Sequence, residues 1–239
     1  MIAITDANGH GDLPDAHAAV NRPAATGAVP EPATTRRGSE THWDAAYRDR
    51  GTAGVSWFQA APAASVEQIH ALDIPTDAAV LDVGGGASTL ADALLAEGFS
   101  DLSVLDVSAV ALGALRQRLG SDAGVALIHS DLLTWEPERS FDLWHDRAVF
   151  HFFVEDGARR RYLDRLHQAL RVGGHVIVGA FAADGPQRCS GLPVARYTPE
   201  ALSEALGPDV DVLVHTREEH VTPTGAMQPL TWLAARLRG

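Results

Sequence analysis

From residue 79 to the end of the chain, short apolar runs alternate with amphipathic stretches of helical period. The apolar runs predict strands at 79–83, 102–107, 125–129, 141–146 and 175–181, with two later strands near 210–218 and 229–237. Strands that alternate with helices favour parallel pairing, right-handed crossovers and a sheet with both faces covered. The pattern therefore predicts a doubly wound α/β domain with helices on both faces.

The first part of the chain has a different pattern. Residues 1–38 are rich in Ala, Pro, Gly and Thr and poor in aromatic side chains, which is typical of a disordered leader. Aromatic side chains follow at once, and Trp43 and Tyr47 stand four residues apart, as on one face of a helix. We therefore expect a single domain over 39–239, with N-terminal cap helices at 39–75 and the α/β core at 76–239.

Charge and composition narrow the possible partners. The chain carries 31 acidic and 19 basic side chains, a net charge of −12, and every basic residue is Arg. This balance argues against binding to nucleic acid and to an anionic membrane surface. The single Cys leaves no intrachain disulfide, and we find neither a signal peptide nor an apolar run of the roughly 20 residues that span a bilayer. A cytoplasmic protein is expected, and the Lys-free, Ala- and Arg-rich composition suggests a GC-rich bacterial genome.

Candidate chemistry gathers where the predicted strands end. Asp82 and the glycines at 84–86 end the first strand, Asp106 ends the second, Asp131 follows the third and Asp146 ends the fourth. In open α/β sheets, ligands bind beside the carboxyl ends of the strands. We therefore expect a ligand site at this edge of the sheet.

The glycine turn and the next carboxylate indicate a cofactor that contains a nucleoside. Glycines allow the ligand to approach the backbone closely, and an acid about 20 residues later can accept both hydroxyls of a ribose. The turn alone also fits a tight strand-to-helix connection, and Asp106 alone also fits a helix N-cap. A nicotinamide enzyme would carry a third glycine where Thr89 stands. Asp82 would repel a pyrophosphate but suits a cationic amino group, which favours S-adenosylmethionine.

Five segments together resemble a class I S-adenosylmethionine-dependent methyltransferase over about residues 41–239. They are LDVGGGAS (81–88), SVLDVS (103–108), HSDLL (129–133), FDLWHDRAVFHF (141–152) and LRVGGHVIVGAF (170–181). Ser88 replaces the last glycine of the family's first motif, and Val172 replaces a proline before the fifth strand. The resemblance implies a Rossmann-like, seven-stranded, mostly parallel sheet of order 3-2-1-4-5-7-6, with strand seven antiparallel.

The resemblance also implies a cofactor site made by the matched motifs: Asp82, Gly84, Gly85, Gly86, Asp106, Val107, Asp131, Leu132 and Asp146. In this assignment Asp82 binds the methionine amino group and Asp106 the ribose. Asp131 and Leu132 hold the adenine, and Asp146 lines the methionine side.

Aromatic residues before the core resemble the N-terminal segment that covers the cofactor in related enzymes. Tyr47, Trp57 and Phe58 are expected to close the site over the methionine end. The alternative is that these aromatic residues only anchor the first helices to the core.

The acceptor side has fewer signals. His151 could act as a general base, or it could be a structural histidine, and Asp146 is the second candidate catalytic residue. Arg147 could bind a substrate carboxylate or form a salt bridge within the protein. Cys189 could contact a soft acceptor or be a small buried residue, and Tyr197 of the same loop could close the pocket. No histidines show paired metal-ligand spacing, and no metal is expected.

The expected activity is methyl transfer from S-adenosylmethionine, giving S-adenosylhomocysteine, to a heteroatom (S, N, O or a heavier chalcogen) of a small molecule by in-line displacement. The alternatives are a protein lysine methyltransferase, an NAD(P)-dependent oxidoreductase and a non-catalytic module that binds S-adenosylmethionine. An enclosed pocket would favour a small molecule, and a shallow acidic groove would favour a lysine. The sequence gives no oligomeric state.

Overall fold

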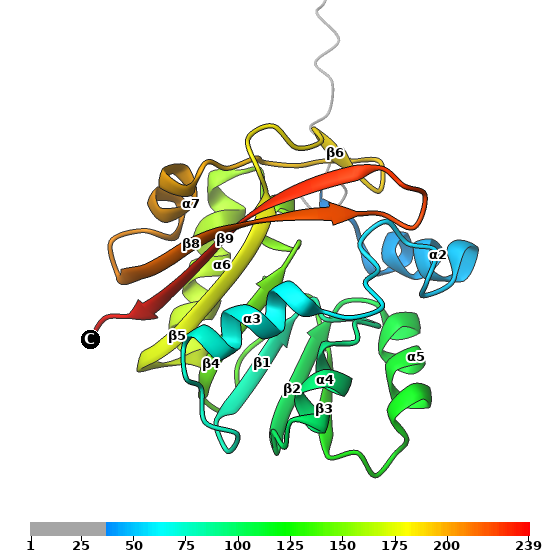
Figure 1. Ribbon diagram of the computed structural model, residues 1–239, viewed down its shortest axis with the longest axis horizontal. Coiled ribbons are helices and arrows are strands. Elements are labelled where there is room, and N and C mark those ends of the chain that lie inside the picture. Colours follow the sequence, from blue (N-terminus) through cyan, green and yellow to red (C-terminus); the bar gives the residue numbers. More distant parts are fainter. Residues whose placement is uncertain (1–36) are drawn as a thin grey trace, which may run out of the picture. The chain divides into compact units, whose positions relative to one another are not determined.

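The computed structural model describes residues 37–239, and the leader predicted over 1–38 lies almost wholly outside them. The helices are α2 (Glu40–Arg50), α3 (Ala63–Ala71), α4 (Leu90–Ala96), α5 (Ala109–Leu119), α6 (Asp156–Ala169) and α7 (Pro199–Leu206), with the short 3₁₀ helix η1 (Phe150–Phe152). The strands are β1 (Ala79–Val83), β2 (Asp101–Asp106), β3 (Val125–His129), β4 (Phe141–Arg147), β5 (Leu170–Phe181), β6 (Arg188–Cys189), β7 (Leu192–Pro193), β8 (Val210–Val221) and β9 (Met227–Leu237) (Figure 1). Within this part of the chain, no helix has the length and apolar character needed to cross a membrane.

Seven strands form one sheet in the order β3-β2-β1-β4-β5-β9-β8. Strands β1 to β5 pair in parallel, whereas β9 runs antiparallel to both β5 and β8. Because β8 and β9 are the sixth and seventh strands of this sheet along the chain, the predicted order 3-2-1-4-5-7-6 is confirmed. The last hairpin thus forms one edge of the sheet, with β9 beside β5 and β8 outermost (Figure 1).

Helices cover both faces, as the alternating pattern predicts. On one face, Ile69 of α3 and Leu94 of α4 pack in the same core as Val80 of β1. On the other face, Leu166 of α6 packs in the same core as Leu81, which points to the opposite side of β1. Both strand residues are fully buried, so the central strands are apolar throughout.

Local polar contacts place α2 beside the carboxyl ends of the strands. Ser108 caps α5 as expected for that residue type, because its hydroxyl accepts a hydrogen bond from the backbone N–H of Ala111 at 3.1 Å. The same hydroxyl donates to Asp44 of α2 at 2.7 Å, and Asp44 also accepts from the N–H of Val110. One buried carboxylate therefore joins α2 to the start of α5, whereas α3 packs on the face of the sheet.

Candidate active site

Two clefts open at this edge of the sheet. The large cleft contains about 830 Å³ of empty space, counting the part open to solvent, and the small cleft about 510 Å³. The large cleft is lined by Arg37, Gly38, Trp43, Tyr47, Trp57, Val83, Gly84, Leu105, Asp106, Val107, Ser130, Asp131, Leu132, Arg147, Ala148, Val149, Phe152, Phe153 and Cys189. The small cleft is lined by Tyr47, Thr52, Val55, Trp57, Phe58, Gln59, Ser65, Asp82, Gly84, Gly85, Ala87, Ser88, Thr89, His145 and Arg147. Four residues line both clefts, which therefore adjoin: Tyr47, Trp57, Gly84 and Arg147.

The glycine turn has no room for side chains, because other residues pack directly against its backbone. Gly86 has a φ of +50°, and a Cβ there would lie 2.8 Å from the Tyr47 hydroxyl and 2.9 Å from a carboxylate oxygen of Asp106. A Cβ on Gly85 would lie 2.3 Å from Oδ2 of Asp82. The turn thus brings bare backbone against two carboxylates, and this arrangement fits a ligand with both hydroxyl and ammonium groups.

Asp106 keeps one carboxylate oxygen for a ligand. Its Oδ1 accepts a hydrogen bond from the N–H of Ser108 at 2.7 Å, and the residue lines the large cleft. Burial raises the pKa of Asp106 to about 7; the Ser108 hydrogen bond opposes that rise and the charge of Asp82 adds to it. A partly protonated carboxyl group in a cleft is typical of a site that becomes fully ionised when donors reach it.

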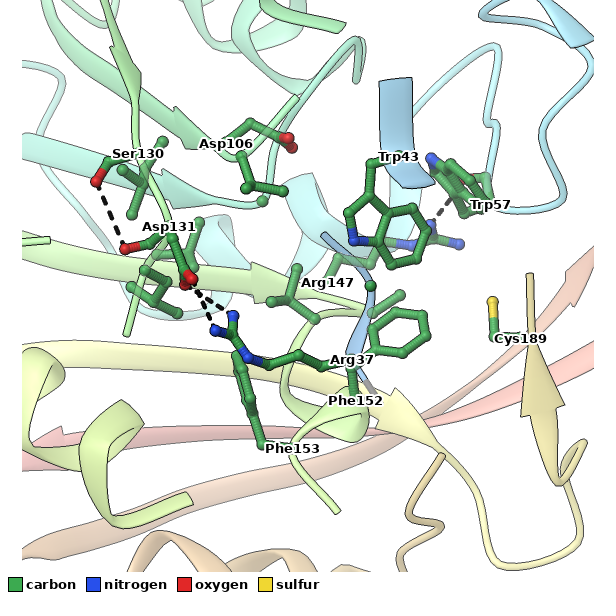
Figure 2. Close-up of a pocket in the computed structure, with 18 of the residues that line it drawn as sticks. Arg37, Trp43, Trp57, Asp106, Ser130, Asp131, Arg147, Phe152, Phe153 and Cys189 are labelled. Atoms are coloured by element: carbon green, nitrogen blue, oxygen red, sulfur yellow. Dashed lines mark hydrogen bonds and ion pairs between the residues drawn. The ribbon is translucent and has the colours of Figure 1, made fainter. Parts of the chain in front are cut away.

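Asp131 is paired with Arg37 across the large cleft (Figure 2). The guanidinium donates to both carboxylate oxygens, at 2.8 and 2.7 Å, and Oδ1 also accepts from the N–H of Leu133. Burial acts to raise the pKa of Asp131, but the hydrogen bonds from Arg37 and Leu133 outweigh it, and the pKa is lowered. Arg37 was not among the predicted site residues, because it lies in the segment assigned to the leader.

Asp82 is held by a histidine that the sequence-based site did not include. Asp82 and His145 are register partners on β1 and β4, and Nδ1 of His145 lies 2.8 Å from Oδ1 of Asp82. Both side chains are buried and both line the small cleft. Nε2 of His145 is buried without a hydrogen-bond partner among the described residues. The pair fixes the orientation of the Asp82 carboxylate at the glycine turn.

Aromatic side chains cover the junction of the clefts. The Trp57 indole donates to the Tyr47 hydroxyl at 3.0 Å, and both residues line both clefts, whereas Phe58 lines the small cleft only. Trp43 packs edge-on against Trp57 and Phe152, with ring centroids 5.6 and 5.0 Å apart. The same aromatic residues thus pack against one another and line the clefts.

The guanidinium of Arg147 is already bonded to protein groups. It donates to the carbonyl oxygen of Trp57 at 3.1 Å and to Oε1 of Glu218 at 3.0 Å, and both charged side chains are about nine-tenths buried. The structure therefore shows the salt-bridge alternative for Arg147, with a glutamate of β8 that the sequence analysis did not single out. Arg147 still lines both clefts.

The two residues expected to be catalytic lie outside the clefts. Asp146 is fully buried, accepts from the N–H groups of Val149 and Phe150, and accepts from the hydroxyl of Tyr162 at 2.8 Å. Burial raises its pKa to about 6. The carboxylate ties its own loop to α6 and does not line the methionine side, contrary to expectation.

His151 is also fully buried, on η1, and lines neither cleft. Its Nδ1 accepts from the N–H of Phe181 at 3.3 Å, and burial together with the charge of Arg147 lowers its pKa to about 3. A ring without solvent-accessible surface cannot take a proton from a molecule in the cleft. The geometry therefore supports the structural interpretation of His151.

The two loop residues differ in position. Cys189 lines the large cleft but is buried, and burial raises its pKa to about 11, so it is a neutral thiol near pH 7. Tyr197 is buried against Phe150 and lines neither cleft, contrary to the expectation that it closes the pocket. No group of three or more His, Cys, Asp or Glu side chains that could hold a metal occurs within residues 37–239.

Comparison with known proteins finds methyltransferases. A family model described as "Methyltransferase domain" matches residues 80–174, which include the glycine turn and strands β1 to β4. Among curated proteins, the chain is 27% identical over 163 residues to EEF1A lysine methyltransferase 2 of Danio rerio, covering 61% of this chain and 70% of that protein. It is 28% identical over 173 residues to the Homo sapiens protein of the same name, covering 65% and 71%.

Solved structures share the fold. One, from work on the conversion of a disulfide bond into a thioacetal group during echinomycin biosynthesis, matches with a TM-score of 0.68 and 21% identity, over 83% of this chain and 93% of that one. The Burkholderia thailandensis 1,6-didemethyltoxoflavin-N1-methyltransferase, solved with S-adenosylhomocysteine, matches with a TM-score of 0.61 and 22% identity, over 84% and 87%. The family model, the sheet order and the solved structures together show a methyltransferase domain with the class I, Rossmann-like fold of S-adenosylmethionine-dependent methyltransferases.

Proposed function

We propose that the enzyme methylates a heteroatom (S, N, O or a heavier chalcogen) of a small molecule bound at the aromatic end of the large cleft. One observation carries the proposal. Away from Asp106 and Asp131, this cleft is lined by Trp43, Trp57 and Phe152, and its described lining includes no further carboxylate.

The donor is proposed to lie across both clefts. Asp106 and Val107 would hold the ribose, Asp131 and Leu132 the adenine, and Asp82 with the glycine turn the methionine amino group. When bound, S-adenosylmethionine supplies a methyl group on a sulfonium, which an incoming heteroatom displaces in line. The protein's part is to position the two molecules and exclude water, which can contribute about 7–11 kcal/mol to lowering the barrier.

Charge at the acceptor end favours a neutral or anionic acceptor. The cation there is Arg147, and its partner Glu218 is already bonded to it. A lysine ammonium entering this cleft would lose water without gaining a free carboxylate, which is costly. An aromatic wall instead suits a small, flat or apolar molecule.

The alternative acceptor is a protein lysine. Its support is the likeness to the two EEF1A lysine methyltransferases, each under 30% identical to this chain. The two proposals differ in what must reach the methyl group: a whole small molecule bound in the cleft, or one side chain of a large protein.

A methyl-transfer screen with isotope-labelled donor separates the possibilities. Thiols, selenols, phenols, carboxylates and amines should be tested beside intact EEF1A and free lysine. Labelling of a small molecule that is lost in a Trp43→Ala variant with unchanged S-adenosylhomocysteine affinity would support the proposal. Labelling of EEF1A alone would establish the lysine alternative, and donor binding without transfer to any acceptor would favour a non-catalytic module.

The source and location belong to the same proposal. We propose a bacterial, cytoplasmic enzyme on the Lys-free composition and the sequence features described above. Its single domain over 39–239 and its dispensable leader also remain proposals.

A further inference from the structure

We infer that Glu218 of β8 is a positioning residue that holds the segment 52–61 over the junction of the two clefts. The inference rests on the proposed donor site. Glu218 is far from the glycine turn in sequence, and the clefts are not lined by it. It would therefore act through the residues that it holds.

Both oxygens of the Glu218 carboxylate are used by donors from three parts of the chain. Oε1 accepts from the Gln59 side chain at 2.7 Å and from Arg147 at 3.0 Å, and Oε2 accepts from the indole of Trp232 at 2.9 Å. The Glu218 side chain is only 10% exposed. A buried carboxylate that accepts from three donors holds those donors in fixed positions relative to one another.

The segment 52–61 joins α2 to α3 and contributes Trp57 to both clefts. It is attached from outside: the Trp57 carbonyl accepts from Arg147, and the Ser56 carbonyl lies 2.7 Å from Nε2 of His220. The hydroxyl of Thr89, beside the glycine turn, donates to the Gln59 carbonyl. The Gln59 side chain and Arg147 both donate to Glu218, so the charge of this carboxylate keeps Trp57 in place.

The chemistry of the partners makes the charge necessary. All three partners of Glu218 are donors, so an amide in its place would have to direct its own N–H₂ at a donor, whichever way it turned. The Arg147 guanidinium, itself 11% exposed, would also lose its countercharge. Glu218→Gln keeps the shape of the side chain and therefore isolates this effect.

The neighbouring residue offers a matched control. Glu219 points to the opposite side of the same strand, is 51% exposed and pairs with Arg217 at the surface. Glu219→Gln makes the same chemical change one residue away, at a carboxylate whose hydrogen bond comes from Arg217 and not from the segment 52–61.

The test measures dissociation of S-adenosylhomocysteine from the full chain by stopped-flow fluorescence, with chymotrypsin cleavage at Trp57 and Phe58 as a second readout. We expect at least tenfold faster dissociation in Glu218→Gln, and cleavage that the ligand no longer suppresses, while Glu219→Gln behaves as the wild type. A merely structural role would lower thermal stability and leave the dissociation rate unchanged. Wild-type dissociation and protection in a folded Glu218→Gln variant would overturn the inference.

A second variant covers the case in which Glu218→Gln does not fold. Gln59→Met removes one attachment and leaves Arg147 paired, so we expect about threefold faster dissociation; a wild-type rate would again overturn the inference. The readout does not involve the acceptor, so the nature of the methylated molecule can be wrong without affecting it. If the wild-type chain did not bind S-adenosylhomocysteine, the proposed donor site itself would fail.

Discussion

Asp106 should make donor binding depend on pH. Its pKa in the free protein is raised to about 7, first by burial and then by the charge of Asp82. A ribose hydroxyl donates a stronger hydrogen bond to the ionised carboxylate than to the protonated carboxyl group, so we expect a bound ligand to lower this pKa. Lowering the pH protonates Asp106 of the free protein and thereby weakens binding of S-adenosylhomocysteine.

The expected magnitude follows from that pKa. With this pKa, Asp106 of the free protein is about one-tenth ionised at pH 6 and about nine-tenths ionised at pH 8. In the complex we take its pKa to lie below 6. The affinity should therefore fall about tenfold between pH 8 and pH 6, or roughly 1.3 kcal/mol at 1.36 kcal/mol per pKa unit. The other groups that shift this pKa are Asp44, which raises it, and His129, which lowers it.

Isothermal titration calorimetry in two buffers of different ionisation enthalpy measures both the affinity and the proton release. Near pH 6, about one proton should leave per ligand bound; near pH 8, almost none should come from Asp106. Asp106→Asn should bind weakly at both values, and it reports the titration of the ligand's own amino group. His129→Gln is the control for the nearby imidazole and should keep the slope. Equal affinities at pH 6 and pH 8, with no more proton release than in Asp106→Asn, would refute the reasoning.

Three further changes test residues whose surroundings the structure redefines. Replacing His151 with Leu should leave the pH profile of kcat unchanged. It should cost about 1–3 kcal/mol of unfolding free energy, because the Phe181 N–H loses its acceptor. If the variant lost one ionisation from the pH profile, His151 would be the general base after all. Replacing Arg37 with Ala should raise S-adenosylhomocysteine affinity up to about fivefold, the value of an ion pair of about 1 kcal/mol that competes for Asp131; weaker binding in calorimetry would show that Arg37 helps to hold the ligand. Replacing Tyr162 with Phe should cost about 1–3 kcal/mol in denaturant unfolding, because its hydroxyl joins two buried groups; unchanged stability would contradict that accounting.

The fold could be predicted because the signals that determine it are local. Apolar runs and helical periods identify the elements, and short connections with right-handed crossovers leave few arrangements of them. The N-cap at Ser108 is another local signal, since a hydroxyl at that position reaches the next turn. The motif resemblance then supplied the strand order.

Side-chain direction at the strand ends could not be predicted in the same way. Asp82, Asp106 and Asp146 all stand at the ends of predicted strands, and sequence position alone does not separate them. After β4 the chain turns through Ala148, which has a φ of +68°. This turn brings the N–H groups of Val149 and Phe150 to the Asp146 carboxylate, which therefore forms hydrogen bonds within its own loop. The predicted place of Asp146 in the site was wrong, because a left-handed backbone conformation is expected at glycine or asparagine, and an alanine stands at position 148.

The acceptor end depends on contacts that have no period along the sequence. Glu218 and Glu219 are adjacent and chemically identical, yet one is 10% exposed and bonded to Arg147, and the other is 51% exposed at the surface. Gln59 and Glu218 are hydrogen-bonded although they lie 159 residues apart in the sequence. From the sequence, each of these polar residues alone is expected at the surface. Strand alternation says only that the two glutamates face opposite sides. Which side is buried depends on the segment 52–61 packing there, so this part of the site follows from the tertiary structure and can be tested only through the residues that it brings together.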